Sequence, residues 1–459
     1  MPATPTLYLS EYTNFKEEHI KNCLPPQKQE RTQKIWQALV EFATQKANEK
    51  FLKFEYPRTL ATQNYVGLIQ VKGFCVEILP KICGYNLLEG HISNCKKQIT
   101  KLNRSKFQAQ VKAFVNAEPI STDSKEPSCS ICHAKQVLYN CLATLKKPPF
   151  IKNQFSHVSN ANLPLLDIFA QMFLRECQQL IGRGLKRDYL SVSKNRSFLK
   201  GKLEFANHLK NNIIHEERFY TKSDEYILDV APNRLLKSTL NRLRTLSLSP
   251  KTQEKLNAVY FVFDEINPSK DIDADFAKSA HATRFREYKN LLAWCDLFLR
   301  RKSLAPYSGK SKAYALLFPM EELFESFVGV WLQRSLKDYH VGLQQQNIKH
   351  LARDKNFRNC FELRPDIVLT NQEQVLILDT KWKLIKGQKK VSREDLYQMW
   401  AYASKYASIE LKDKKRVVSV WLVYPWQEPR ICATWTFKAS EAFGSPIDLK
   451  VDYFPLGNL

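Results

Sequence analysis

Short apolar runs separated by polar turns dominate the N-terminal part of the chain, a pattern typical of β-strands. Residues 65–82, YVGLIQVKGFCVEILPKI, form two such runs on either side of Lys72 and Gly73. Glycine adopts the positive φ that a two-residue hairpin turn requires, so this stretch predicts a β-hairpin. Residues 30–49 have the spacing of an amphipathic helix. We therefore expect a β-rich N-terminal domain over residues 1–160.

The middle of the chain changes to helical spacing. The apolar run LPLLDIFAQMFLRECQQLI predicts a helix that ends near Gly184, and further helices are expected over residues 232–246 and 284–301. Residues 184–205, GLKRDYLSVSKNRSFLKGKLEF, are basic and strand-like. Their lysines suit a phosphate-binding surface and equally suit a solvated face. These patterns predict a helical middle region with a basic strand segment over residues 161–305.

The C-terminal part alternates between helical and strand patterns. Residues 320–339 follow a proline and predict an amphipathic helix. Residues 361–383, FELRPDIVLTNQEQVLILDTKWK, predict two strands joined by a polar turn, and a second helix is expected to start at Ser392. An apolar strand over residues 417–424 follows. This order predicts a mixed sheet flanked by helices over residues 306–459, and an α/β multidomain fold for the whole chain.

The two strands of the C-terminal hairpin carry a set of charged residues that suits metal-dependent chemistry. Asp366 belongs to the first strand, Asp379 ends the apolar run of the second, and Lys381 follows two residues later. Because side chains alternate along a strand, Asp379 and Lys381 point the same way and Thr380 the other way. Mg²⁺ binds one or two carboxylates together with phosphate and water oxygens. The pattern therefore predicts Asp366 and Asp379 as metal ligands for phosphodiester hydrolysis, with Lys381 acting on the water or the transition state.

The helix after this hairpin adds two polar side chains on one face. Gln398 and Tyr402 are four residues apart and so lie one turn apart. They either position the metal site or contact DNA, or they simply pack the helix. Asp395 stands three residues after Ser392, the spacing of a capping box.

The charge balance favours a polyanionic partner. The chain has 70 Lys and Arg against 46 Asp and Glu, a formal charge of +24, and 44% hydrophobic residues. A globular protein with this excess is expected to bind nucleic acid. No secretory signal and no apolar run near the roughly 20 residues of a membrane span is visible. We expect a cytoplasmic protein that does not bind membranes.

The cysteines and a phosphate-loop fragment give weaker signals. The 11 cysteines have no disulfide-like spacing, and a zinc site from Cys129, Cys132 and Cys141 or His133 would lack a second pair of closely spaced cysteines. Residues 309–311, GKS, lack the first glycine of a nucleotide-binding loop. The chain is therefore expected to have no NTPase site of its own.

Several of these motifs, in this order, resemble the PD-(D/E)xK nuclease superfamily. Asp366 and Asp379-Thr-Lys381 match its core motif, and Gln398-Met-Trp-Ala-Tyr402 is similar to the Q-x-x-x-Y helix of its RecB-type members. The resemblance implies a further acidic metal ligand on the preceding helix, here Glu325 or Glu321.

Most of the chain also resembles the McrC family, the nuclease subunit of the McrBC 5-methylcytosine-specific restriction system. The resemblance is carried by YVGLIQVKGFCVEILPKI, GLKRDYL, LKGKLEF, LLFPMEELFESFVG, RPDIVL and LILDTKWK. It implies a Mg²⁺-dependent endonuclease subunit of an antiviral defence system that cuts modified double-stranded DNA. It also implies a hexameric AAA+ GTPase partner of the McrB type, with residues 1–160 as the partner-docking domain.

Two other functions stay open from the residues alone. The chain could be a stand-alone nuclease of the same fold in DNA repair or recombination, which would cut without a partner. It could also be a non-catalytic adaptor that binds DNA and activates an AAA+ partner, although the intact Asp366, Asp379 and Lys381 argue against this.

Overall fold

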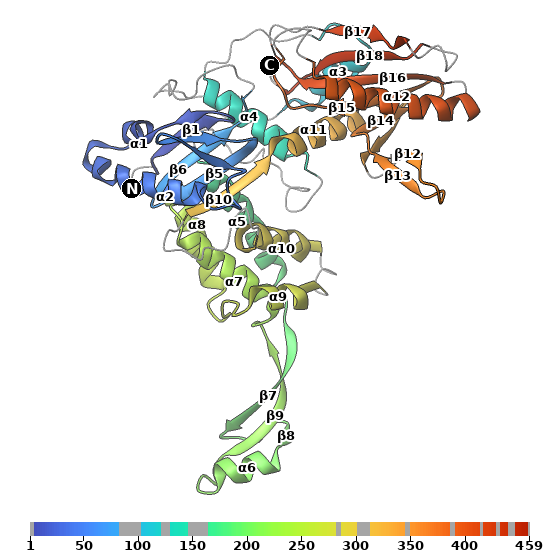
Figure 1. Cartoon of the computed structure of the whole chain (residues 1–459). Helices are drawn as coiled ribbons and strands as arrows, with labels where there is room; N and C mark the ends of the chain where they lie inside the picture. Colours follow the sequence, from blue (N-terminus) through green and yellow to red (C-terminus); the bar gives the residue numbers. More distant parts are fainter. Residues whose placement is uncertain are drawn as a thin grey trace. The chain divides into compact units, whose positions relative to one another are not determined.

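Helices and β-sheets occur in both of the units into which the chain divides (Figure 1). The computed structural model describes residues 4–81, 102–120, 129–145, 164–280, 286–300, 313–344, 349–385, 391–413, 416–427, 432–438 and 446–457. One unit is Met1–Thr4 with Pro164–Pro306, and the other is Pro5–Leu163 with Tyr307–Leu459. The predicted α/β multidomain fold is confirmed. The phosphate-loop fragment at residues 309–311 lies outside the described residues.

The predicted N-terminal hairpin forms the centre of a four-stranded sheet. The sheet order is β1 (Thr6–Ser10), β6 (Phe74–Leu79), β5 (Tyr65–Val71) and β10 (Ala313–Pro319). Strands β5 and β6 are antiparallel, and their turn residues Lys72 and Gly73 both have positive φ, 45° and 78°. Strand β10 pairs antiparallel with β5, although the sequence suggested that its residues belong to the C-terminal domain. Pairing of strands so distant in sequence leaves no local signal.

The helix predicted over residues 30–49 is shorter than expected. A 3₁₀ turn, Pro26–Arg31, leads into α2 (Thr32–Ala43). The helix ends there because the Asn48 side chain donates to the Phe42 carbonyl oxygen at 3.0 Å, which satisfies a carbonyl group that a longer helix would use. Around it lie α1 (Glu17–Cys23) and a second sheet in the order β2 (Asn14–Phe15), β4 (Thr59–Thr62) and β3 (Leu52–Glu55).

The C-terminal part of the same unit contains the predicted mixed sheet. Its order is β11 (His340–Leu343), β14 (Ile367–Thr370), β15 (Gln374–Thr380), β16 (Val417–Pro425), β18 (Asp448–Phe454) and β17 (Ala433–Thr436). Strands β15, β16 and β18 are parallel and the other pairs are antiparallel. The apolar run predicted as a buried strand is β16.

Helices cover this sheet on both faces (Figure 1). The helices are α3 (Arg104–Val115), α11 (Met320–Ser335) and α12 (Arg393–Asp413), whereas α4 (Ser130–Leu142) contacts α11 and the N-terminal strand β6. Phe114 of α3 packs edge-on against Trp421 of β16, with ring centroids 5.6 Å apart. Because side chains alternate along a strand, the next residue on each strand faces α12 instead. Asp379 of β15 is on that second face, opposite Leu422.

A separate two-stranded hairpin precedes the central strands. It consists of β12 (Lys349–Arg353) and β13 (Asn359–Leu363), which are antiparallel. Its sequence is polar and charged, so the hydrophobic pattern did not indicate it. Three residues separate its last residue, Leu363, from Ile367, the first residue of β14.

The other unit contains the predicted helices and a second β-structure. The helices are α5 (Leu165–Arg183), α7 (Ala231–Arg244), α8 (Pro250–Val262), α9 (Ile272–Ser279) and α10 (Arg286–Leu299). Gly184 ends α5 with φ 95°, as its sequence position suggested. The basic segment forms β7 (Asp188–Arg196) and β8 (Lys202–Leu203), followed by α6 (Phe205–Asn212) and β9 (Phe219–Ile227). Strand β9 pairs with both β7 and β8.

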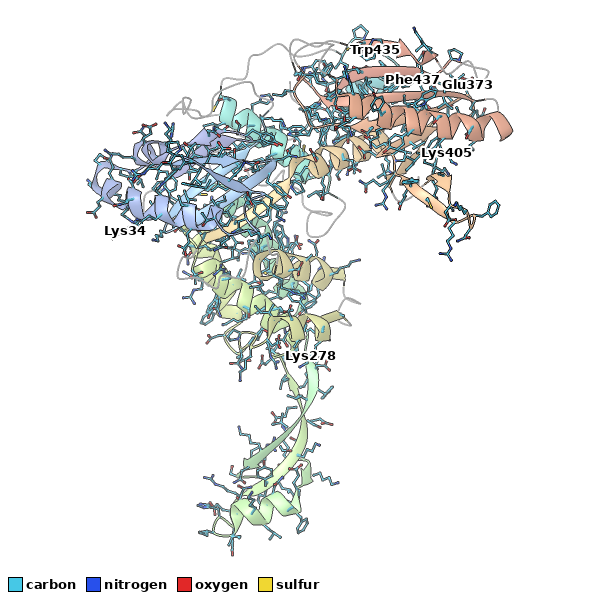
Figure 2. The ribbon with its side chains drawn as sticks, viewed as in Figure 1. Lys34, Lys278, Glu373, Lys405, Trp435 and Phe437 are labelled. Atoms are coloured by element: carbon cyan, nitrogen blue, oxygen red, sulfur yellow. The ribbon has the colours of Figure 1, made fainter. Side chains whose placement is uncertain are left out.

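Charged side chains lie on the surface of both units, for example Lys34 of α2 and Lys278 of α9 (Figure 2). In the part of the chain that the structure describes, no helix has the length and apolar character needed to span a membrane.

Candidate active site

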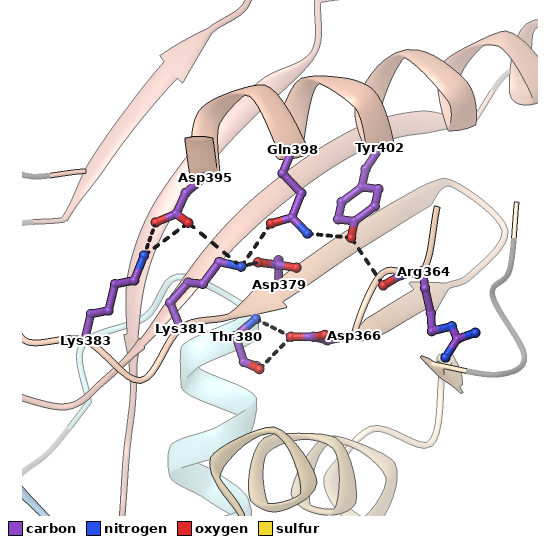
Figure 3. A network of polar contacts seen from close by, with 9 residues as sticks. All are labelled: Arg364, Asp366, Asp379, Thr380, Lys381, Lys383, Asp395, Gln398 and Tyr402. Atoms are coloured by element: carbon purple, nitrogen blue, oxygen red, sulfur yellow. Dashed lines mark hydrogen bonds and ion pairs between the residues drawn. The ribbon is translucent and has the colours of Figure 1, made fainter. Parts of the chain in front are cut away.

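The β14–β15 hairpin brings the two predicted metal-binding aspartates to the same end of the sheet (Figure 3). Ile367 pairs with Leu378, so the next step of the same register places Asp366 opposite Asp379. Asp366 is fixed by three hydrogen bonds. Its Oδ2 accepts from the Thr380 amide at 2.8 Å and from Thr380 Oγ1 at 2.7 Å, and its carbonyl oxygen accepts from the Gln344 amide at 3.0 Å. The Thr380 contacts were not expected from the sequence.

Lys381 lies beside Asp379, as strand alternation predicted. Its Nζ is 2.5 Å from Asp379 Oδ2, and its backbone amide donates to the Val423 carbonyl at 2.9 Å, which continues the β15–β16 ladder past Thr380. Asp379 is only 2% exposed, whereas Lys381 is half-buried. Lys381 therefore lies between the buried carboxylate of Asp379 and the protein surface.

Helix α12 completes the site through Gln398 and Tyr402. Lys381 Nζ donates to Gln398 Oε1 at 3.0 Å, and Gln398 Nε2 donates to the Tyr402 hydroxyl at 2.9 Å. The Tyr402 hydroxyl in turn donates to the Arg364 carbonyl oxygen at 3.2 Å, two residues before Asp366 (Figure 3). The two residues do share one helix face. They link Lys381 to the segment just before β14, which carries Asp366.

Asp395, three residues after the expected capping residue Ser392, pairs with two lysines of the motif. The helix does begin after Ser392, but the carboxylate of Asp395 is 2.9 Å from Lys383 Nζ and 3.9 Å from Lys381 Nζ. Asp395 is buried, so these two cations supply its counter-charge. One signal for this is visible in the sequence, because Asp395 is three residues before Gln398 and so on the same helix face.

Burial and mutual repulsion raise the pKa values of the carboxylates in the site. Burial first, and then the neighbouring Asp366, raises the pKa of Asp379 to about 7, although Lys381 opposes the change. Burial likewise raises the pKa of Asp366, against the hydrogen bonds from Thr380. Burial disfavours the charged form of Lys381, but Asp379 and Asp395 outweigh it and raise the lysine pKa. The site concentrates negative charge around one firmly protonated lysine.

Glu325 of α11 is half-buried and within the electrostatic field of the two aspartates. Burial, followed by the charges of Asp366 and Asp379, raises the pKa of Glu325 to about 8, and a hydrogen bond to Gln344 opposes this. Glu321, one turn earlier, is exposed. Nowhere in the described ranges do three His, Cys, Asp or Glu side chains gather closely enough to hold a metal ion. Glu325 as a third ligand stays a prediction.

The cysteines weighed for zinc lie on one helix. Cys129 precedes α4, Cys132 is in its first turn, and Cys141 is near its end. Burial raises the pKa of the Cys141 thiol. Among the described residues, these cysteines belong to no group of three His, Cys, Asp or Glu side chains that could hold a metal ion.

A residue of the N-terminal sheet reaches the motif from outside the C-terminal sheet. Glu11, directly after β1, accepts a hydrogen bond from the Trp382 indole at 2.8 Å and one from the Lys81 amide at 3.1 Å. Trp382 is buried against Phe324 of α11, with ring centroids 5.3 Å apart. Because Trp382 follows Lys381, this contact ties β1 to the lysine of the site. No local pattern in the sequence predicts this contact.

Comparison with known proteins shows the family of the chain. The family model of the McrBC 5-methylcytosine restriction system component matches residues 60–425. The chain belongs to this family. The resemblance to McrC noted in the sequence is thereby confirmed.

Two relatives in the McrBC family are similar over different lengths. The type IV methyl-directed restriction enzyme EcoKMcrBC of Escherichia coli strain K12 is 24% identical over 254 residues, which cover 52% of this chain and 71% of that protein. A chain in the half-complex from a tetradecameric assembly of Thermococcus gammatolerans McrB AAA+ hexamers with bound McrC has a TM-score of 0.59 at 15% identity. That match covers 98% of this chain and 94% of the other, so the fold extends over the whole length.

Proposed function

We propose that this chain is the endonuclease subunit of a modification-dependent restriction complex and hydrolyses DNA phosphodiester bonds with Mg²⁺. The observation that carries the proposal is the set of contacts at the end of the β14–β15 hairpin. Asp366 and Asp379 oppose each other there, and Lys381 stands between Asp379 and Gln398. Membership of the McrBC family supports the same assignment.

The donor set fits Mg²⁺. Two carboxylates at opposed positions suffice for an ion that keeps several waters and binds substrate phosphate. The raised pKa values of Asp379 and Glu325 reflect charge repulsion as well as burial, and a cation among these carboxylates would relieve that repulsion. Asp366 and Asp379 would hold the ion, with Glu325 supporting it. When bound, the ion lowers the pKa of a water and neutralises charge on the phosphate oxygens.

Lys381 acts as a cation and not as a base. Its pKa is raised, so it carries a full charge at neutral pH. It can therefore donate to the attacking water or to a phosphate oxygen on which negative charge grows, which stabilises the transition state more than the ground state. Gln398 and Tyr402 hold the lysine in this orientation, because its Nζ donates to the amide that Tyr402 fixes. The water oxygen forms the new bond to phosphorus, and the bond to the leaving sugar oxygen breaks.

The partner is proposed from the comparisons. The structurally similar chain is bound to McrB AAA+ hexamers, and we infer an AAA+ GTPase partner here as well. Residues 1–160 are expected to dock on it. The segment from β7 to β9 also presents large exposed apolar side chains, a feature of protein contact surfaces. They include Tyr189, Phe198, Leu199, Phe205, Leu209, Ile213 and Ile214.

The test is plasmid cleavage in Mg²⁺ by the chain together with the AAA+ protein encoded beside it. Wild type, Asp379→Ala and Lys381→Ala are compared on methylated and unmethylated DNA. We expect cleavage only by the wild type, on methylated DNA with nucleotide present, and a loss of at least about a hundredfold in each variant. Glu373→Ala, at the exposed turn before β15 (Figure 2), is the control and should cleave normally.

The other outcomes separate the competing functions. Cleavage that requires neither partner nor methylation would identify a stand-alone nuclease. Stimulated nucleotide hydrolysis by the partner, without cleavage by any form of the chain, would leave the non-catalytic adaptor. If Asp366→Ala and Asp379→Ala cut as well as the wild type, the assignment of the site is wrong.

A further inference from the structure

The β12–β13 hairpin is an exposed element attached directly to the candidate active site. Strand β13 continues through Arg364 and Pro365 into Asp366. The carbonyl oxygen of Arg364 accepts the hydrogen bond from Tyr402, so the base of the hairpin is part of the network that reaches Lys381. The nitrogen of Lys349, at its other end, lies 5.9 Å from the centre of the Tyr406 ring of α12. One end of the hairpin therefore joins the network of the site, and the other end lies beside helix α12.

The hairpin displays two aromatic side chains to solvent, Phe357 in its turn and Phe361 in strand β13. Phe357 is 81% exposed and Phe361 is 74% exposed. Both have a backbone in the left-handed region, with φ of 59° and 55°, which is rare for bulky residues. Exposed phenylalanine side chains and a left-handed backbone at bulky residues do not stabilise the folded state. Such features are typical of binding surfaces.

The hairpin is also basic, and its anions are already engaged. Residues 349–364 contain five Lys or Arg against two Asp or Glu. Asp354 accepts from the backbone amides of Asn356 and Arg358 at 2.8 Å each, and Glu362 pairs with Arg364 at 2.6 Å. Lys355 and Arg358 are exposed, and no acidic side chain in the described ranges pairs with them.

We propose that the β12–β13 hairpin binds duplex DNA next to the bond that is cut. This rests on the proposed function of the site. Lys355 and Arg358 contact the phosphates, and Phe357 and Phe361 contact the sugar edges and bases in the minor groove, where apolar side chains act as wedges. Nine residues separate Phe357 from Asp366, at most about 30 Å of extended chain. One turn of duplex is about 34 Å, so the contact falls within one turn of the cut.

The positive charge of the β12–β13 hairpin favours DNA over a protein as its partner. The hairpin has excess positive charge, continues directly into the catalytic strand, and belongs to a chain with a formal charge of +24. A duplex whose scissile phosphate lies at Asp366 and Asp379 must extend beyond the site on both sides. The unpaired cations next to the site are therefore placed where phosphates must pass.

The experiment measures binding of a short fluorescent duplex by the full chain in EDTA, at several salt concentrations. Lys355→Ala/Arg358→Ala should weaken binding and reduce the slope of log affinity against log salt by about two, one per lost phosphate contact. The control Lys251→Ala/Lys278→Ala removes the same charge from exposed positions on α8 and α9 and should keep the wild-type slope. Phe357→Ala/Phe361→Ala should weaken binding roughly tenfold at every salt concentration without changing the slope.

The aromatic control is Phe261→Ala, which removes another exposed phenylalanine and should bind as the wild type does. Equal affinity and slope for wild type and both hairpin variants would overturn the proposal, even if the complex cleaves DNA normally. Loss of partner stimulation with unchanged DNA binding would assign the hairpin to the protein partner and also overturn it. Weakened DNA binding in a chain that never cleaves would support the hairpin while the nuclease function fails.

Discussion

At the scale of single residues, the most informative side chain lies outside the predicted motif and beside the candidate site. Glu11 is 3% exposed and accepts hydrogen bonds from Trp382 and from the Lys81 backbone. Burial, with a contribution from Glu321, raises the pKa of Glu11 to about 7, although Lys81 opposes this. A buried carboxyl that is easily protonated thus adjoins the strand end that carries Lys381.

This pKa makes the stability of the protein depend on pH. In the unfolded chain a glutamate titrates near 4.5, so between that pH and about 7 the folded state binds the additional proton. The stabilisation is complete below the unfolded value and is lost as the pH rises through 7. Glu11→Gln imitates the protonated form, so we expect it to exceed the wild type at pH 8 by up to about 3 kcal/mol in free energy of unfolding.

Denaturant unfolding of wild type and Glu11→Gln at pH 4.5, 6 and 8 measures this difference. The two proteins should be similar at the lowest pH and diverge as the pH rises. Glu18→Gln, at an exposed position on α1, serves as the control and should follow the wild type throughout. Parallel profiles for wild type and Glu11→Gln would contradict the prediction.

At the scale of elements, the sequence predicts the features that depend on neighbouring residues, such as turns, helix starts and strand alternation. The β5–β6 turn, the helix after Pro319 and the opposition of Asp366 and Asp379 follow from glycine, proline and strand alternation. The β12–β13 hairpin was missed because it has no buried face and hence no hydrophobic pattern. The contact of Glu11 with Trp382 was missed because it joins segments far apart in sequence, where only tertiary packing decides.

The pairing of β10 with β5 requires a residue without a side chain at position 67, which can be tested. Gly67 has φ +137°, and a Cβ there would lie 2.0 Å from the Leu316 carbonyl oxygen. Gly67→Ala should therefore push β10 away and destabilise its unit by about 3 kcal/mol or more. Gly182→Ala is the matched control, because its Cβ meets no atom within 4 Å in α5, and it should stabilise slightly. Equal thermal unfolding of Gly67→Ala and the wild type would rule out the tight pairing.

At the scale of the whole molecule, each unit has its own aromatic core. In the unit around residues 164–306, the ring of Trp294 lies 5.7 Å from Phe298 and 6.4 Å from Phe169. In the other unit, Phe327 lies 5.6 Å from Phe107 and 6.1 Å from Phe454. These last three residues come from α11, α3 and β18, so the helices and the sheet of the candidate nuclease share one core.

Two separate cores predict two calorimetric unfolding transitions. Trp294→Ala and Phe327→Ala each remove a buried aromatic ring, which costs about 3–5 kcal/mol. For units of this size the loss corresponds to a decrease of roughly 10 °C in the midpoint of the affected transition. Each variant should lower the unfolding temperature of its own unit and leave that of the other unit unchanged. The two variants therefore serve as controls for each other. A single transition that both variants lower equally would show that the chain unfolds as one cooperative body, in which neither unit can be destabilised separately.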